Sequence, residues 1–236
     1  MSDIPGVALQ AYQRAAGVID ASDKACHLPW TVLAAIGRVE SDHGRFGSSA
    51  LSNAGVSTPA VYGVPLDGRK HVQTIADTDG GSLDQDPMWD RAVGPMQFLP
   101  STWSVVAVDG DGDGRRDPQD INDAALGAAV YLCAGDQDLA TPAGQRAAVH
   151  RYNHSAAYVD LVLGIAQSYE RNDPAIRTLS SVFEPMPIQE PTPASHHETA
   201  TKTRPARPAG PASSPSPAPT RPSPTPAATT PTPTPT

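Results

Sequence analysis

The sequence lacks several features that would place it among membrane, nucleic-acid-binding or disulfide-rich proteins. It holds no run of roughly 18 apolar residues, so no segment is predicted to span a membrane. Residues 1–5 do not combine positive charge with an apolar stretch, so they are not expected to be a signal peptide. Cysteine is limited to Cys26 and Cys133, which are compatible with one disulfide or with two buried thiols.

Aromatic residues are absent from residues 185–236, which instead hold 16 of the 26 prolines. Such a segment cannot bury enough apolar surface to offset the entropy of ordering it, so it is predicted to be a disordered tail. Its Pro, Ser and Thr are typical of extended spacers and of O-glycosylated stalks, although a solvated tail without a partner has the same composition. Residues 1–184 suit a single domain.

Positive charge is scarce in residues 1–184. The whole chain has a formal net charge of −8, and because the tail contributes +2, the predicted domain carries −10. Nucleic-acid binding requires Lys and Arg to neutralise phosphates, so an acidic domain of this kind is a poor candidate for it.

Helical periodicity dominates the predicted domain. Residues 44–92, in contrast, are rich in Gly, Pro, Ser and Asp and are predicted to be irregular, and a loop of that length is usually functional or held by other parts of the fold. No convincing strand alternation occurs, so we predict a mostly α domain. The expected helices cover residues 7–21, 30–41, 100–106, 121–134 and 143–151, with a last helix that Ser155 caps and that includes Tyr158 and Tyr169.

Glutamate is rare, and Glu40 is the only one before Glu170. At about 100° per residue, Glu40 falls within the apolar stripe formed by Leu33 and Ile36, whereas Arg38 points away from it. A carboxyl group among apolar neighbours has its charged form disfavoured, so its pKa should rise toward the range of a general acid at neutral pH. The alternative is a buried carboxyl that accepts hydrogen bonds from the loop backbone.

Residues 109–114 alternate Asp and Gly, as in the first half of an EF-hand calcium loop. Asp120 would close a loop of standard length, and Asp123 would close a longer one. Carboxylates this close repel one another without a cation, so we predict a structural calcium site rather than a solvated acidic turn. The expected ligands are Asp109, Asp111, Asp113, the backbone carbonyl of Arg115, and Asp120 or Asp123. A looser acidic group is expected to cap turns instead: Asp77, Asp79, Asp84 and Asp86.

Four segments spread over residues 30–165 carry a specific set of motifs. They are Ala34–Ser41, which ends in a Glu-Ser pair; Val93–Trp103; the acidic loop with the helix that follows it; and Tyr152–Ser155 followed by Tyr158. In this order the segments resemble the lytic murein transglycosylases of the membrane-bound B type and, more closely, their exported actinobacterial relatives. One segment alone would be a weak match, but the four together are specific.

The resemblance implies a mostly α, lysozyme-like fold and cleavage of the β-1,4 bond between N-acetylmuramic acid and N-acetylglucosamine in peptidoglycan glycan strands. It implies that Glu40 is the catalytic acid and base and that Asp123 closes the calcium loop. We expect a monomer that works outside the cytoplasm, at the cell wall, without an organic cofactor. Met88–Arg91 departs from the Ser-Tyr-Ala-Gly run of the family's type member. The positions that match the family's sugar groove are Gln97, Tyr131, Tyr152, Asn153 and Tyr158.

Only one catalytic carboxylate is predicted, whereas ordinary glycosidases use two. A lytic transglycosylase needs one, because the C6 hydroxyl of its own substrate is the nucleophile and the product is a 1,6-anhydro sugar. Three alternatives stay open: a hydrolytic muramidase in which water attacks the same bond, a non-catalytic wall-binding protein, and a calcium-dependent interaction protein.

The compartment that the resemblance implies favours a disulfide between Cys26 and Cys133, because disulfides persist outside the cytoplasm. This bond would join the segment before the helix of Glu40 to the Ala-rich helix that carries Tyr131.

Overall fold

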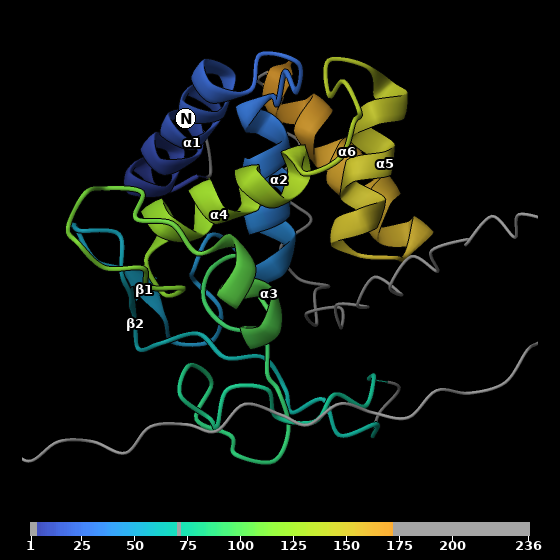
Figure 1. The fold of residues 1–236 in the computed structure, drawn as a ribbon. Helices are drawn as coiled ribbons and strands as arrows, with labels where there is room; N and C mark the ends of the chain where they lie inside the picture. The colour runs from blue at the N-terminus through green and yellow to red at the C-terminus, as the bar shows by residue number, and fades with distance from the viewer. Residues whose placement is uncertain (1–3, 70–71, 172–236) are drawn as a thin grey trace, which may run out of the picture. The chain divides into compact units, whose positions relative to one another are not determined.

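Six α-helices account for most of the regular secondary structure in residues 4–69 and 72–171, which are the residues that the computed structural model describes (Figure 1). They agree with the predicted helices to within a residue or two, so the mostly α prediction is confirmed. The predicted tail, residues 185–236, and the boundary at residue 184 lie outside the described residues. The helices are α1 (Gly6–Ser22), α2 (Trp30–Ser41), α3 (Pro100–Val106), α4 (Ile121–Cys133), α5 (Pro142–Tyr152) and α6 (Ala156–Glu170).

Side-chain caps fix where three of these helices begin. Asp120 accepts a hydrogen bond from the backbone N–H of Asn122 at the start of α4, and Thr141 does the same for α5. Ser155, the predicted cap of α6, accepts from the N–H of Tyr158. Each cap satisfies one of the N–H groups that the first turn of a helix leaves unpaired.

Helix α2 is the buried centre of the domain. It packs against α1 on one side and α6 on the other, and Figure 1 shows it between them. The sequence predicted one apolar stripe, but every residue from Thr31 to Ser41 is buried, Arg38 included. Gly37 permits this close packing, because a Cβ there would lie 2.0 Å from the hydroxyl oxygen of Tyr12. The last turn of α2 is therefore held inside the protein.

Two short strands lie within residues 44–92, which the sequence predicted to be irregular. β1 (Ala50–Leu51) and β2 (Ser57–Thr58) pair in antiparallel fashion, with Ala50 opposite Thr58. Strands of two residues are too short to show the alternation by which a strand is recognised in a sequence.

The irregular segment between β2 and α3 is held by buried carboxylates rather than by regular secondary structure. Asp90 accepts hydrogen bonds from both the backbone N–H and the hydroxyl of Thr78, and Asp84 accepts from the backbone N–H of Arg91. Asp77 accepts from the backbone N–H groups of residues 79 to 81. The predicted capping role of this acidic group is confirmed. Figure 1 shows the segment below the helices, in teal and green.

The predicted disulfide between Cys26 and Cys133 is present, with a distance of 5.6 Å between the two Cα atoms. It joins the turn between α1 and α2 to the last residue of α4. Within the described part of the chain, no helix has both the length and the apolar character needed to cross a membrane.

Candidate active site

Glu40 lies in the last turn of α2, and its side chain is almost completely enclosed, with only 3% of the residue exposed. Leu33 and Ile36, which share its helix face, are fully buried. The carboxyl atom Oε1 accepts a hydrogen bond of 2.5 Å from the hydroxyl of Tyr158, a fully buried residue of α6. The partner of Glu40 is therefore a tyrosine hydroxyl on another helix and not the loop backbone that the sequence left as an alternative.

Burial raises the pKa of Glu40 to about 8, and the hydrogen bond from Tyr158 opposes that rise. A cation could have kept the carboxyl ionised, but the guanidinium of Arg38 pairs with Asp42 at 2.6 Å. Glu40 is consequently protonated at neutral pH, as a general acid must be before it donates.

A tight turn before α3 is fixed against the end of α2. The hydroxyl of Ser41 donates to the backbone carbonyl of Pro95 at 2.6 Å and accepts from the N–H of Gly44. Gly94 has a φ of +74°, and a Cβ at this residue would lie 1.7 Å from the carbonyl oxygen of Pro118. A side chain at this position would collide with that carbonyl, which explains why the Val93–Trp103 motif has a glycine there.

Gln97 belongs to the same turn and is buried, with a left-handed backbone φ of +51°. Its amide Nε2 donates to the carbonyl of Gly94 at 2.9 Å, which fixes the orientation of the side chain. A left-handed conformation at a non-glycine residue is uncommon and is often found at functional sites.

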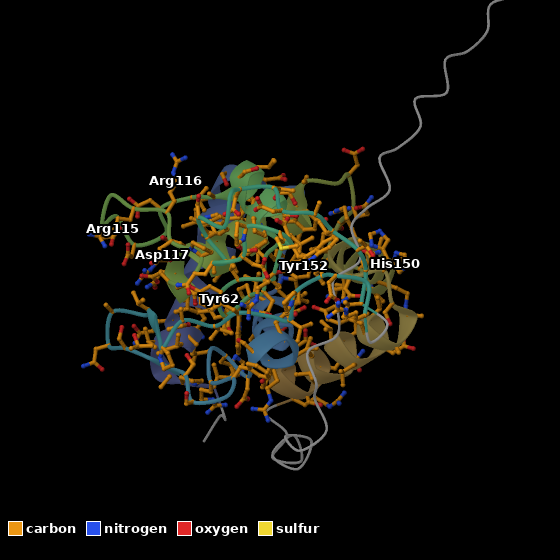
Figure 2. All side chains as sticks on the ribbon, turned by 90° about the horizontal axis from the view of Figure 1, so that it is seen from below. Tyr62, Arg115, Arg116, Asp117, His150 and Tyr152 are labelled. Atoms are coloured by element: carbon orange, nitrogen blue, oxygen red, sulfur yellow. A yellow bond between two sulfur atoms is a disulfide. The ribbon has the colours of Figure 1, made fainter. Side chains whose placement is uncertain are left out.

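Tyr152 of α5 contacts this turn, and Tyr131 of α4 packs against Tyr152. The hydroxyl of Tyr152 donates to the carbonyl of Met96 at 2.8 Å, and its ring meets Tyr131 edge to face at 5.6 Å between centroids. Burial, followed by the negative charge of Glu40, raises the pKa of Tyr152 well above 10. Tyr152 is therefore close enough to Glu40 to sense its charge, and it is labelled in Figure 2.

Asn153 is the C-terminal cap residue of α5 and is 1% exposed. Its Oδ1 accepts from the N–H of Ser155, but its Nδ2 has no hydrogen-bond partner among the described residues. A buried amide donor without a partner is uncommon in native proteins, and a ligand oxygen could satisfy it.

The structure thus brings four of the predicted groove residues into one connected region with Glu40: Gln97, Tyr131, Tyr152 and Tyr158. Asn153 follows Tyr152 directly in the chain.

His43 is a buried residue of this region that the sequence did not single out. Its Nδ1 lies 3.0 Å from the hydroxyl oxygen of Tyr12, and its Nε2 lies 3.2 Å from that of Tyr169. It therefore connects the end of α2 to both α1 and α6. Burial, together with Arg38 and Arg45, holds the pKa of His43 well below 6.5, so the ring is neutral. Its position directly after the Glu-Ser-Asp run was the only available signal.

The acidic loop gathers three of its predicted ligands. Carboxylate oxygens of Asp109, Asp111 and Asp123 lie within 4.8 Å of one another. Asp123 is nearly fully buried and accepts from the backbone N–H of Gly110, and burial raises its pKa to about 6. A set made only of carboxylate oxygens suits a hard cation such as Ca²⁺.

Two other predicted ligands lie outside that group. Asp113 accepts a hydrogen bond from the backbone N–H of Arg115, and Asp120 is occupied as the N-terminal cap of α4. Of the two residues considered for closing the loop, the geometry favours Asp123, because it follows the cap and faces back into the loop. Figure 2 shows Arg115 at the edge of the domain. A second acidic triad with oxygens equally close is formed by Asp77, Asp79 and Asp90.

The described residues thus form a mostly helical domain whose central helix ends in a buried carboxyl bonded to a tyrosine hydroxyl, beside a tightly fixed turn. Residues 6–150 match the model of a family described as transglycosylase SLT domain, and the chain belongs to this family. Membership indicates lytic transglycosylase activity on peptidoglycan.

Among solved structures, the chain is similar to the Escherichia coli lytic transglycosylase Slt35 in complex with bulgecin A. The two are 16% identical with a TM-score of 0.40, and the match covers 69% of this chain and 74% of that one. No curated protein sequence matches the chain.

Proposed function

We propose that this chain is a peptidoglycan lytic transglycosylase of the membrane-bound B type that uses Glu40 as its single acid and base. Its bond would be the β-1,4 linkage between N-acetylmuramic acid and N-acetylglucosamine. The observation that carries the proposal is the environment of Glu40, buried with a pKa of about 8 inside a transglycosylase SLT domain. The helical arrangement around it would be lysozyme-like.

Catalysis would use the carboxyl group of Glu40 twice, first as an acid and then as a base. Protonated Glu40 donates to the glycosidic oxygen while the bond from that oxygen to C1 of the muramoyl residue breaks. The resulting carboxylate takes the proton of the C6 hydroxyl of the same sugar, and O6 bonds to C1. The products are a 1,6-anhydro-muramoyl end and a free N-acetylglucosamine end, and Glu40 is protonated again. The nucleophile is part of the substrate, so holding its geometry replaces a bimolecular step by an intramolecular one.

The groove residues divide into two roles in this proposal. The hydroxyl of Tyr158 is committed to Glu40 at 2.5 Å, so Tyr158 positions the carboxyl. Asn153 has an unpaired amide donor and would contact a sugar oxygen. Gln97, Tyr131 and Tyr152 would form the floor of the groove, because each side chain is fixed by a hydrogen bond to a backbone carbonyl. The acceptors are the carbonyl groups of Gly94, Arg151 and Met96, respectively.

The experiment is digestion of purified cell-wall sacculi followed by mass spectrometry of the released muropeptides. The proposal predicts anhydro-muropeptides, each lighter by one water than the product of a muramidase. Release of hydrated ends would identify a hydrolytic muramidase. Sedimentation with the wall but no release would identify a non-catalytic wall-binding protein.

We further propose that Asp109, Asp111 and Asp123 hold a structural calcium ion. The support is the exclusively carboxylate donor set and the burial of Asp123, whose ionised form a cation would stabilise. The ion would fix the loop to the start of α4. No organic cofactor is needed for the chemistry proposed above.

We also propose that the protein works as a monomer outside the cytoplasm, at the cell wall. The substrate lies there, and the disulfide between Cys26 and Cys133 suits an oxidising compartment.

A further inference from the structure

Arg91 is held rigidly in the irregular segment that precedes the fixed turn. Its guanidinium lies over the ring of Tyr62, 5.5 Å from the ring centroid, and its Nε donates to the carbonyl of Gly63 at 2.8 Å. Its backbone N–H donates to the fully buried carboxylate of Asp84 at 2.7 Å. The ring of Tyr62 is itself oriented, because its hydroxyl accepts from the side chain of Gln85. The side chain of Arg91 is therefore preorganised.

Among the described residues, the two terminal nitrogens of this guanidinium have no hydrogen-bond partner. Over residues 4–69 and 72–171, Arg91 forms no ion pair, and only its Nε is engaged in a side-chain hydrogen bond. The nearby carboxylates of Asp84 and Asp90 are occupied with the backbone and with Thr78. An arginine without a carboxylate partner in so acidic a segment has a planar pair of donors available, which is the geometry that binds a carboxylate through two hydrogen bonds.

Arg91 also lies close to the proposed catalytic groove. Gly63, whose carbonyl it binds, packs against Gln97, since a Cβ on Gly63 would lie 3.1 Å from Oε1 of Gln97. The turn that contains Gln97 is in turn bonded to Ser41, the neighbour of Glu40.

We propose that Arg91, braced by Tyr62, forms a subsite for a carboxylate of peptidoglycan. This inference rests on the proposed function and identifies a chemical group of the substrate that the site binds. Two carboxylates have the required chemistry: the lactyl carboxylate of a muramoyl residue that carries no peptide, and a carboxylate of the stem peptide. Recognition is bidentate, so charge alone is insufficient and lysine does not replace arginine.

The test measures sedimentation of the full-length Glu40→Gln protein with insoluble sacculi, so that binding is read without cleavage. Three walls are compared: untreated wall, wall whose carboxylates are converted to neutral amides, and wall stripped of its peptides by an amidase. We expect affinity for untreated wall to fall about tenfold when the carboxylates are blocked. When Arg91→Gln or Arg91→Lys is added to the Glu40→Gln protein, its affinity for untreated wall should fall by a similar factor. Its affinity for blocked wall should not fall further.

The stripped wall identifies the source of the carboxylate. If the effect of Arg91→Gln persists there, the lactyl carboxylate is bound, and if the effect disappears, the stem peptide is bound. Arg116→Gln removes the same charge from an exposed position of the acidic loop and is the matched control, expected to bind like its parent.

Equal loss on untreated and blocked walls would overturn the proposal, because it would mean that Arg91 only supports the fold. Affinity of the Glu40→Gln protein that does not respond to blocking would overturn it as well, independently of how any Arg91 variant folds. The proposed function fails separately, if the wild-type protein releases no anhydro-muropeptides, because binding does not depend on that chemistry.

Discussion

At the scale of single residues, the main finding is that one buried carboxyl has one hydrogen-bond partner. Glu40 receives the Tyr158 hydroxyl while its surroundings disfavour its charge. Periodicity within α2 predicted the burial of Glu40 because it specifies which residues share a face. It could not predict Tyr158 as the partner, since periodicity says nothing about which helices meet, and only the family resemblance connected residues 118 positions apart.

The first prediction concerns the pH dependence of cleavage. Activity should be high below the pKa of Glu40, about 8, and should fall as the pH rises through that value, because the proton donor is lost. Tyr158→Phe removes a hydrogen bond that lowers this pKa, so the alkaline limb should move to higher pH. The measurement is kcat/KM against pH for both proteins. An alkaline limb at the same pH in both would contradict the assignment.

At the scale of elements, the packing of α2 depends on buried polar links as well as on apolar contact. His43 joins α2 to α1 and α6 through Tyr12 and Tyr169. The helix bounds were predictable because capping residues and apolar spacing are local signals. The buried turn, the two short strands and the burial of the second face of α2 could not be predicted, because they depend on contacts between distant residues.

The second prediction concerns His43. His43→Ala removes the hydrogen bonds that His43 makes with Tyr12 and Tyr169 and leaves a cavity, so it should lower the free energy of unfolding by roughly 3 kcal/mol. Its folded-state pKa lies well below 6.5, so the unfolded chain binds more protons as the pH falls below that value. The neutral ring therefore contributes stability at higher pH that is lost on acidification.

Denaturant unfolding at several pH values tests this prediction. The difference in stability between wild type and His43→Ala should shrink as the pH falls below about 6.5. A difference that stays constant between neutral and acidic pH would refute a buried neutral histidine. His27→Ala is the control, because its ring is half exposed and pairs with Asp138 at the surface.

The third prediction concerns the acidic loop. Calcium should raise the melting temperature, because an ion that binds only the folded state stabilises it by mass action. Asp109→Asn with Asp123→Asn should abolish that response, whereas Asp113→Asn, which lies outside the triad, should retain most of it. Thermal melts in calcium and in chelator provide the readout. Identical melts for the wild type under both conditions would rule the site out.

At the scale of the whole molecule, one covalent bond and one buried helix hold the site together. The disulfide joins the entry of α2, which carries Glu40, to the end of α4, which carries Tyr131. The bonded cysteines were predictable from the inferred compartment once the family was recognised. Their distance was not, because it depends on how α1 and α4 pack.

The fourth prediction concerns this disulfide. It spans a separation of 107 residues, so on the chain-entropy model its removal should cost on the order of 4 kcal/mol. Cys26→Ser with Cys133→Ser should unfold at a clearly lower denaturant concentration than the oxidised wild type. A reducing agent should shift the wild type toward the variant and leave the variant unchanged. Coincident transitions for oxidised wild type and variant would show that the bond contributes nothing.

The central claim is that, with Glu40 as the base, the C6 hydroxyl of the substrate attacks C1 of the muramoyl residue in place of water. Digestion of sacculi in water enriched in heavy oxygen tests this most directly, with mass spectrometry of the new muramoyl ends. The account predicts 1,6-anhydro ends without heavy oxygen from the wild-type protein and no release from Glu40→Gln. Hydrated ends that carry heavy oxygen, or undiminished release by Glu40→Gln, would contradict it.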